Sequence, residues 1–123
     1  MSKVICYTKL HLPENYDENS WYFELFSKPL ESQDNVGYVG NGLLRELRRS
    51  KITPSSEALD FVIIAMSVVS ADKAILRRNS PDGWTRQINL EIPLQKAEEW
   101  EKVKDKLEKM LRFLSGDFWK LTF

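Results

Sequence analysis

The spacing of hydrophobic and polar residues changes along this chain, and each change predicts a new element. Residues 3–12 and 20–28 are rich in β-branched and aromatic side chains, which is typical of strands. We expect them to form an antiparallel pair, joined by a loop that is slightly long for a hairpin. Three glycines then interrupt the pattern within residues 32–42, and residues 43–51 have the composition of a short helix.

A long helix is predicted over residues 54–74. Thr53 is its candidate N-cap, Pro54 occupies the first helical position and Glu57 the first turn. Apolar side chains cover most of its circumference, so we expect burial on more than one side and a central position. A buried strand over residues 61–69 is the alternative, because that segment is also strongly β-prone. The capping signals favour the helix.

The C-terminal part predicts a strand, a helix and a second strand. Alternation over residues 84–92 is typical of a half-buried strand, which Pro93 ends. Residues 95–115 carry apolar side chains at helical intervals, and Gly116 suits the left-handed position after the helix. Residues 118–123 alternate again. Because the sequence stops inside an apolar strand, we expect further protein to follow residue 123.

Together these elements predict an α+β fold with two layers. The length suits one domain over residues 1–123, which we expect to be an N-terminal part of a longer chain. The sheet is expected to be mixed or antiparallel, with about four strands packed by two main helices. These are the strands near residues 3–12, 20–28, 84–92 and 118–123, and the helices near residues 54–74 and 95–115.

The composition narrows the classes of function. Eighteen basic and eighteen acidic residues give a net charge of zero, so no overall field attracts nucleic acid or anionic lipid. The N-terminus lacks the features of a signal peptide, and no apolar stretch approaches the roughly 18 residues of a membrane span. The single cysteine and single histidine cannot form a disulfide or a zinc site, so no metal is expected. We therefore expect a cytoplasmic protein without membrane contact.

The segment from Asp82 to Arg86 is the first candidate site. Asp82 and Gly83 form a strong tight-turn signal, in which the aspartate side chain caps the turn. Arg86 shares a strand face with apolar residues, so its guanidinium needs a partner if it is buried. Asp72 or Asp82 could supply that partner. A purely structural turn is the alternative interpretation.

Basic residues form two further candidate clusters. Residues 45–51 contain Arg45, Arg48, Arg49 and Lys51, and residues 73–78 contain the second cluster. Charge on a helix is usually only a solvated surface. The functional alternative is a small nucleic-acid-binding module, which would need these residues in one continuous basic stripe.

Residues suited to catalysis are few. Cys6 and His11 lie on one predicted strand and face opposite sides, so a core thiol is favoured over a nucleophile. The sequence lacks the common phosphate-loop, zinc-protease, serine-hydrolase and paired-cysteine motifs. Each of the four tryptophans lies in a predicted element and is expected in the core.

Several short motifs resemble the N-terminal region of bacterial QueC-like proteins, which are 7-cyano-7-deazaguanine synthase-like proteins of the QatC type from anti-phage defence systems. The similar motifs are "ALDF", "ADK" followed by arginine, "DGWTR" and "LRFLSGDFW", all within residues 54–123. In that family an ATP-pyrophosphatase domain with an SGGxDS-type loop follows this region. The loop is absent from these 123 residues, so the resemblance transfers no catalytic residue and implies no cofactor here, with ATP expected in a following domain.

The resemblance implies a non-catalytic accessory domain that contacts a catalytic domain or subunit of a defence system. We expect the contact surface at the end of the long helix and at the turn after it. It comprises the residues that match the family pattern, namely Asp72, Lys73, Arg78, Asp82, Trp84 and Arg86.

Overall fold

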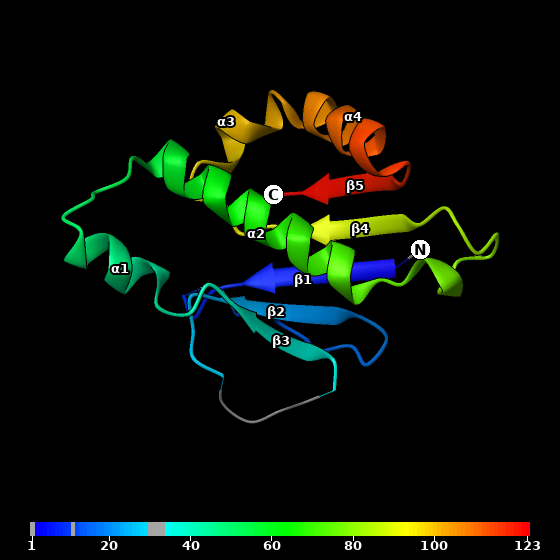
Figure 1. The fold of residues 1–123 in the computed structure, drawn as a ribbon, viewed down its shortest axis with the longest axis horizontal. Helices are drawn as coiled ribbons and strands as arrows, with labels where there is room; N and C mark the ends of the chain where they lie inside the picture. Colours follow the sequence, from blue (N-terminus) through cyan, green and yellow to red (C-terminus); the bar gives the residue numbers. More distant parts are fainter. Residues whose placement is uncertain (1, 11, 30–33) are drawn as a thin grey trace.

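A parallel β-sheet forms the centre of the protein. The computed structural model describes residues 2–10, 12–29 and 34–123. Within these residues the sheet has five strands in the order β3-β2-β1-β4-β5, so β1 lies in the middle (Figure 1). Each neighbouring pair is parallel. The strands are Ser2–Tyr7 (β1), Trp21–Leu25 (β2), Val36–Val39 (β3), Gln87–Glu91 (β4) and Phe118–Thr122 (β5).

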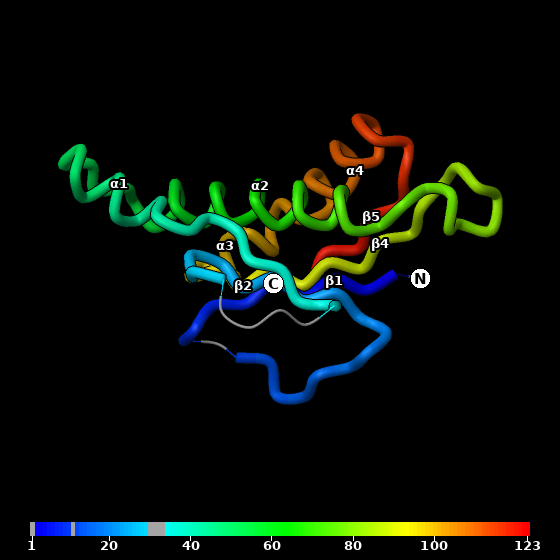
Figure 2. The backbone as a smooth tube through the Cα atoms, turned by 60° about the horizontal axis from the view of Figure 1, so that its bottom comes forward, coloured from blue at the N-terminus to red at the C-terminus, as the bar shows by residue number. Residues whose placement is uncertain are grey.

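The expected mixed or antiparallel sheet of about four strands is therefore wrong. A parallel pair needs a crossover connection instead of a hairpin. Residues 12–20 provide part of that crossover between β1 and β2, and they lie on the sheet face opposite the helices (Figure 2). A connection of this length without a helix has the sequence appearance of a hairpin loop, which explains the error.

β3 is the strand that the sequence pattern missed, because it lies inside the glycine-containing segment. Gly37 pairs with Phe23 of β2. A Cβ at position 37 would lie 2.5 Å from Cε1 of the Phe23 ring, so this position needs a residue without a side chain. Glycine allows close packing here, whereas in a sequence it indicates a break.

Helix α2 (Ser56–Ala74) lies across the sheet. The prediction of a long helix is confirmed, and the alternative strand over residues 61–69 is wrong. Its N-cap is Ser55 instead of Thr53, because the Ser55 hydroxyl accepts the Ala58 N–H at 3.1 Å. Phe61 and Val69 are 58% and 51% exposed, so the expected burial on more than one side is also wrong. Only the face toward the sheet is fully buried.

The predicted helix over residues 95–115 is two helices, which lie with α2 on one face of the sheet (Figure 2). Buried Asp60 of α2 accepts the backbone N–H groups of Gln95 and Lys96 at 2.9 and 2.8 Å, which fixes the entry to the first helix. Gly116 ends the second at φ 77°, as expected. These two helices are α3 (Ala97–Glu101) and α4 (Lys104–Ser115). The structure also contains α1 (Leu43–Arg49) and the short 3-10 helix η1 (Arg77–Asn79).

The core lies between the sheet and the helical layer. Trp119 contributes to it, but the expectation that all four tryptophans are core residues is wrong. Trp21 is partly exposed, and Trp84 is 71% exposed. Strand alternation does not apply to Trp84, because β4 begins only at Gln87. The largest fully buried apolar side chains of this core are those of Val4, Leu25, Ile88, Leu90 and Leu121. Tyr22 is also fully buried, but it packs against Tyr7 and Tyr16 instead.

Candidate functional site

Arg86 is the buried centre of the region that the sequence singled out. Only 3% of it is exposed. Its Nε and Nη2 donate to Oδ2 of Asp117 at 3.0 and 2.7 Å, and Nη2 also donates to Oδ1 of Asp72 at 2.6 Å. Its Nη1 donates to the backbone oxygens of Asp72 and Ile75 at 2.9 and 2.8 Å. The guanidinium thus connects the end of α2 to β4 and to the start of β5.

Arg86 and Asp117 stabilise each other in the charged form. Burial opposes the charge on Arg86, but the hydrogen bonds with Asp117 and Asp72 outweigh that effect and raise the guanidinium pKa. Burial also opposes the charge on Asp117, but the hydrogen bonds from Arg86 outweigh it and lower the carboxyl pKa. The pair is therefore ionised at neutral pH.

The expected partners of Arg86 are confirmed in one case of two. Asp72 bonds to Arg86, as expected. Asp82 instead caps its own turn, because its Oδ1 accepts the N–H groups of Trp84 and Thr85 at 2.8 and 2.7 Å. These bonds lower the Asp82 pKa. Asp117, the main partner, was missed, and its only sequence signal is an acidic residue in the turn between α4 and β5.

Arg77 holds the turn from its outer side. Its Nη1 and Nη2 donate to the two carboxylate oxygens of Asp117 at 2.8 and 3.0 Å, and Nη1 also donates to the Trp84 backbone oxygen at 2.8 Å. Its guanidinium lies 5.6 Å from the centroid of the Trp84 ring, within the range of a cation–π contact. The exposed Trp84 ring is thus carried by a turn that two arginines and two carboxylates fix.

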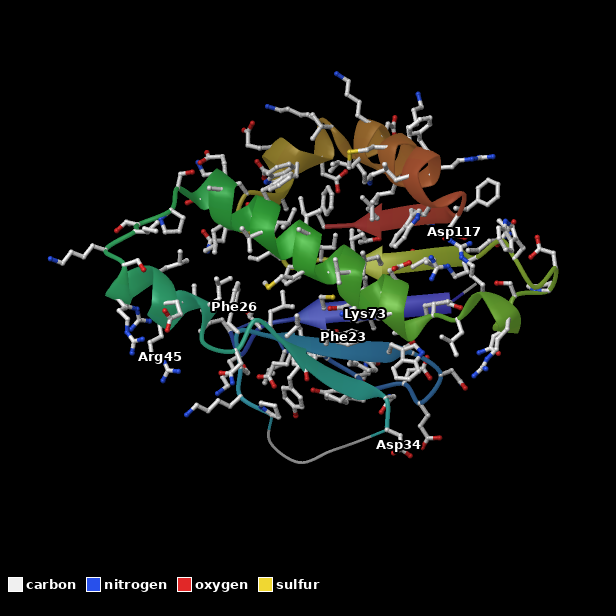
Figure 3. The ribbon with its side chains drawn as sticks, viewed as in Figure 1. Phe23, Phe26, Asp34, Arg45, Lys73 and Asp117 are labelled. Carbon is white, nitrogen blue, oxygen red and sulfur yellow. The ribbon has the colours of Figure 1, made fainter. Side chains whose placement is uncertain are left out.

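The expected contact residues gather at the amino edge of the sheet, where β4 and β5 begin. Figure 3 labels Lys73, in the last turn of α2, and Asp117, directly before β5. Lys73, Arg78 and Trp84 are exposed, whereas Arg86 is inside. A cavity of about 580 Å³ opens at the same edge, lined by Leu76, Asp82, Thr85, Arg86 and Phe118 among others. We call this region the amino-edge surface, defined by Leu76, Arg77, Arg78, Asp82, Trp84 and Phe118.

The two basic clusters do not come together. Arg45, Arg48, Arg49 and Lys51 lie on or directly after α1, and all four are exposed. The cluster over residues 73–78 lies at the other end of α2 (Figure 1). A helix of 19 residues is about 28 Å long at the usual rise per residue, which separates the clusters. The pair of clusters therefore provides no continuous basic stripe.

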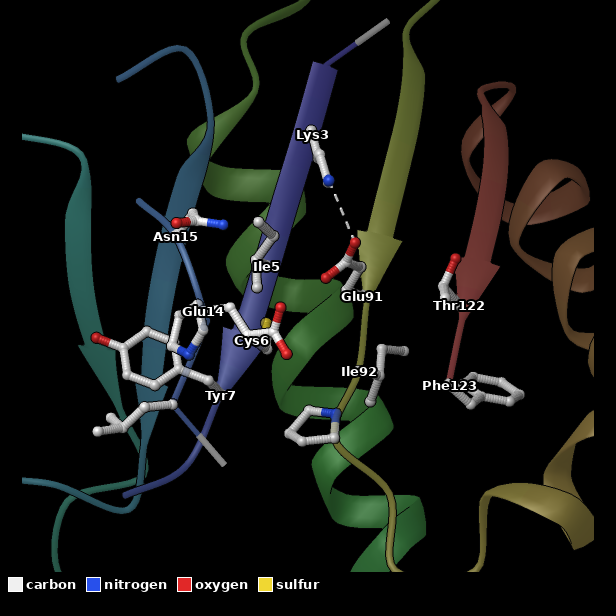
Figure 4. Close-up of a pocket in the computed structure, with 13 residues that line it drawn as sticks. Lys3, Ile5, Cys6, Tyr7, Glu14, Asn15, Glu91, Ile92, Thr122 and Phe123 are labelled. Carbon is white, nitrogen blue, oxygen red and sulfur yellow. Dashed lines mark ion pairs between the residues drawn. The ribbon is translucent and has the colours of Figure 1, made fainter. Parts of the chain in front are cut away.

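A groove also opens on the sheet face opposite the helices, between β1 and β4 (Figure 4). Its volume is about 510 Å³. Strand order reverses between these two strands, and ligands of open α/β sheets often bind at such a point. Lys3 Nζ lies 3.3 Å from Glu91 Oε1 in this groove, and Glu14 adds a second carboxylate to the lining. The groove therefore lacks the excess of positive charge that would attract an anion.

Cys6 is a core residue. Burial raises the pKa of its thiol to about 12, and a hydrogen bond with Ser67 only partly opposes this. The thiol is therefore protonated at neutral pH and lacks the reactive thiolate form. His11, its candidate partner, lies outside the described residues. Within the described part of the chain, no three His, Cys, Asp or Glu side chains are grouped as a metal site would require.

Comparison with protein-family models, curated proteins and solved structures gives no match for this sequence. The resemblance to QueC-like proteins therefore stays a prediction. None of the helices in the described residues is long and apolar enough to span a membrane.

Proposed function

We propose that this chain is a non-catalytic interaction domain that binds a protein partner through its amino-edge surface. The observation that carries the proposal is Trp84, a large aromatic side chain that is 71% exposed on a fixed turn. Tryptophan and arginine are the residues that most often dominate protein interfaces. Here Arg77 stacks on the Trp84 ring, and Arg112 lies 4.0 Å from the centroid of the Phe118 ring.

Hydrogen bonds already hold the turn that carries Trp84 before any partner binds. A side chain that is already fixed loses less conformational entropy when a partner covers it. Asp82 caps the Trp84 turn, and the Arg77–Asp117–Arg86 network anchors both ends of it in the core. Leu76 and Phe118 are each 42% exposed and add apolar area around the cavity. The surface therefore combines aromatic and aliphatic area with exposed cations.

We further propose that the partner is an ATP-pyrophosphatase domain of the QueC-like type from an anti-phage defence system. The resemblance within residues 54–123 supports this partner class. Six residues match the family pattern. Arg78, Asp82 and Trp84 belong to the amino-edge surface, Arg86 lies beneath it, and Asp72 and Lys73 lie in the last turn of α2 next to it.

Co-elution in gel filtration tests the proposal. The chain and a purified QueC-like ATP-pyrophosphatase domain should elute as one complex, and Trp84→Ala should abolish it. Phe113→Ala is the matched control, because Phe113 is another exposed aromatic residue, 88% exposed on α4 and outside the amino-edge surface. Separate elution of the wild-type proteins would contradict the proposed partner. Equal losses from both variants would contradict the proposed surface.

A further inference from the structure

The carboxyl edge of the sheet holds a cavity of about 420 Å³ that we call the basic cavity. Four cationic side chains line it: Lys9, Lys28, Arg45 and Arg48. Lys9 follows β1, Lys28 follows β2, and the two arginines belong to the helix after β3. These residues are distant in sequence, and they meet because the three parallel strands end at the same edge. Open α/β sheets bind ligands at this edge.

The described residues provide no acidic partner for the positive charge in the basic cavity. Among the described residues, no acidic side chain lines the cavity, and none of the four cations forms an ion pair. Glu46, the acidic residue of α1, pairs with Arg49 outside the cavity at 3.3 Å. The groove in Figure 4 differs, because its lysine is paired with a glutamate. Converging like charges repel one another unless an anion lies between them.

Two residues that line the cavity, Phe26 and Gly42, have left-handed backbone conformations. Gly42 has φ 84°, and Arg45 Nη2 would lie 3.7 Å from a Cβ at that position, so the guanidinium folds back over the glycine. Phe26 has φ 64°, a costly value for a residue with a side chain. Its N–H donates to the Val39 oxygen at 2.8 Å, which holds this turn against β3. Phe26 and Arg45 lie at the same end of the molecule in Figure 3.

We propose that the basic cavity binds a small phosphorylated ligand with two or more negative charges, such as an oligophosphate or a nucleotide. Arginine guanidinium groups bind phosphate oxygens in pairs, and lysines add point charges. Asn41 adds a polar group to the wall, and Phe26 and Leu44 add apolar surface for the rest of the ligand. The hydroxyl of Ser27, which also lines the cavity, is buried and donates to Glu24 Oε1 at 3.1 Å. The volume falls within the range of small-molecule sites.

A small ligand suits this geometry better than a nucleic-acid strand. The four cations line one cavity, whereas a strand needs charge along an extended track. Arg49 and Lys51, which would extend such a track along α1, do not line the cavity. The proposal is independent of the amino-edge surface, which lies at the opposite edge of the sheet.

Calorimetric titration of the intact chain with inorganic pyrophosphate and with ATP tests the proposal. Both should bind at one saturable site, and Arg45→Gln should weaken each about tenfold, the typical effect of losing one charge-assisted contact. Arg49→Gln is the matched control, because it removes the same charge from the same helix outside the cavity and should leave affinity unchanged. Circular dichroism should show both variants folded, since both side chains are exposed.

Three results would overturn the proposal. The first is no saturable binding of either compound to the wild-type chain. The second is equal weakening by Arg45→Gln and Arg49→Gln, which would indicate diffuse charge attraction. The third is binding of oligonucleotides only, with an affinity that increases with strand length, which would assign these cations to nucleic acid.

Discussion

Asp117→Asn is the substitution that tests the buried ion pair most selectively. Asparagine keeps the size of the side chain but removes its charge, and it places an amide donor where the arginines also donate. In the native protein the Asp117 carboxylate accepts the Arg86 backbone N–H at 2.9 Å, two contacts from the Arg86 guanidinium and two from Arg77. Arg86 would then retain Asp72 as its only acidic partner among the described residues.

The expected loss follows from the burial of both partners. Asp117 is fully buried and Arg86 nearly so. Removing one partner of a buried pair typically costs about 3–5 kcal/mol, because the other charge stays buried and unpaired. For a domain of this size, a loss of about 3 kcal/mol lowers Tm by about 10 °C. Asp72→Asn is the control, because that carboxylate is 57% exposed and its loss should cost less than about 1 kcal/mol.

Urea unfolding followed by circular dichroism measures the difference. Asp117→Asn should shift the midpoint far more than Asp72→Asn, with an unchanged m-value. A double variant, Arg86→Met with Asp117→Leu, should recover part of the stability, because neither charge then remains buried. Equal midpoints for Asp117→Asn and Asp72→Asn would refute the reasoning, since burial would then not decide the cost.

Three further predictions concern pH, packing and thiol chemistry. Folding lowers the Asp117 pKa below 3.8, so the ionised carboxylate stabilises the folded state. This contribution to the free energy of unfolding should be complete above about pH 4 and decline as pH falls through the folded pKa. In an acid titration, Asp117→Asn should therefore lose stability less steeply than the wild-type chain. Gly37→Ala should destabilise the fold by about 1–3 kcal/mol, because its Cβ would overlap the Phe23 ring, and adding Phe23→Leu should restore part of the loss in urea unfolding. A persistent full loss in that double variant would count against ring overlap. The Cys6 thiol should stay unreactive toward a disulfide reagent until urea unfolds the chain; rapid labelling of the native protein would contradict its burial.

Local signals in the sequence predicted local structure well. Thr53, Pro54 and Glu57 predicted the start of α2 to within two residues, although its N-cap is Ser55, and Gly116 predicted the end of α4. Arg86 needed a partner because it lies on an apolar strand face, and that argument found Asp72. It could not find Asp117, because their contact depends on β5 lying beside β4.

Sheet order and direction were not predictable from the pattern of single strands. The connection after β1 has the length of a long hairpin loop, although it joins parallel strands. The basic cavity depends on the parallel arrangement, because Lys9, Lys28 and Arg45 meet only when three strands end at one edge. The prediction for Trp84 failed for a different reason. Its alternation with Arg86 predicted a buried strand residue, but β4 begins after it, at Gln87, and the side chain is exposed.

The affinity of the amino-edge surface for its partner tests the proposed function most directly. Calorimetric titration of the chain with a QueC-like ATP-pyrophosphatase domain should give saturable binding. Trp84→Ala should weaken it by at least about 2 kcal/mol, roughly thirtyfold, because Trp84 is the exposed centre of the surface. Phe113→Ala should bind like the wild-type chain. Unchanged affinity of Trp84→Ala in a complex that does form would contradict the account.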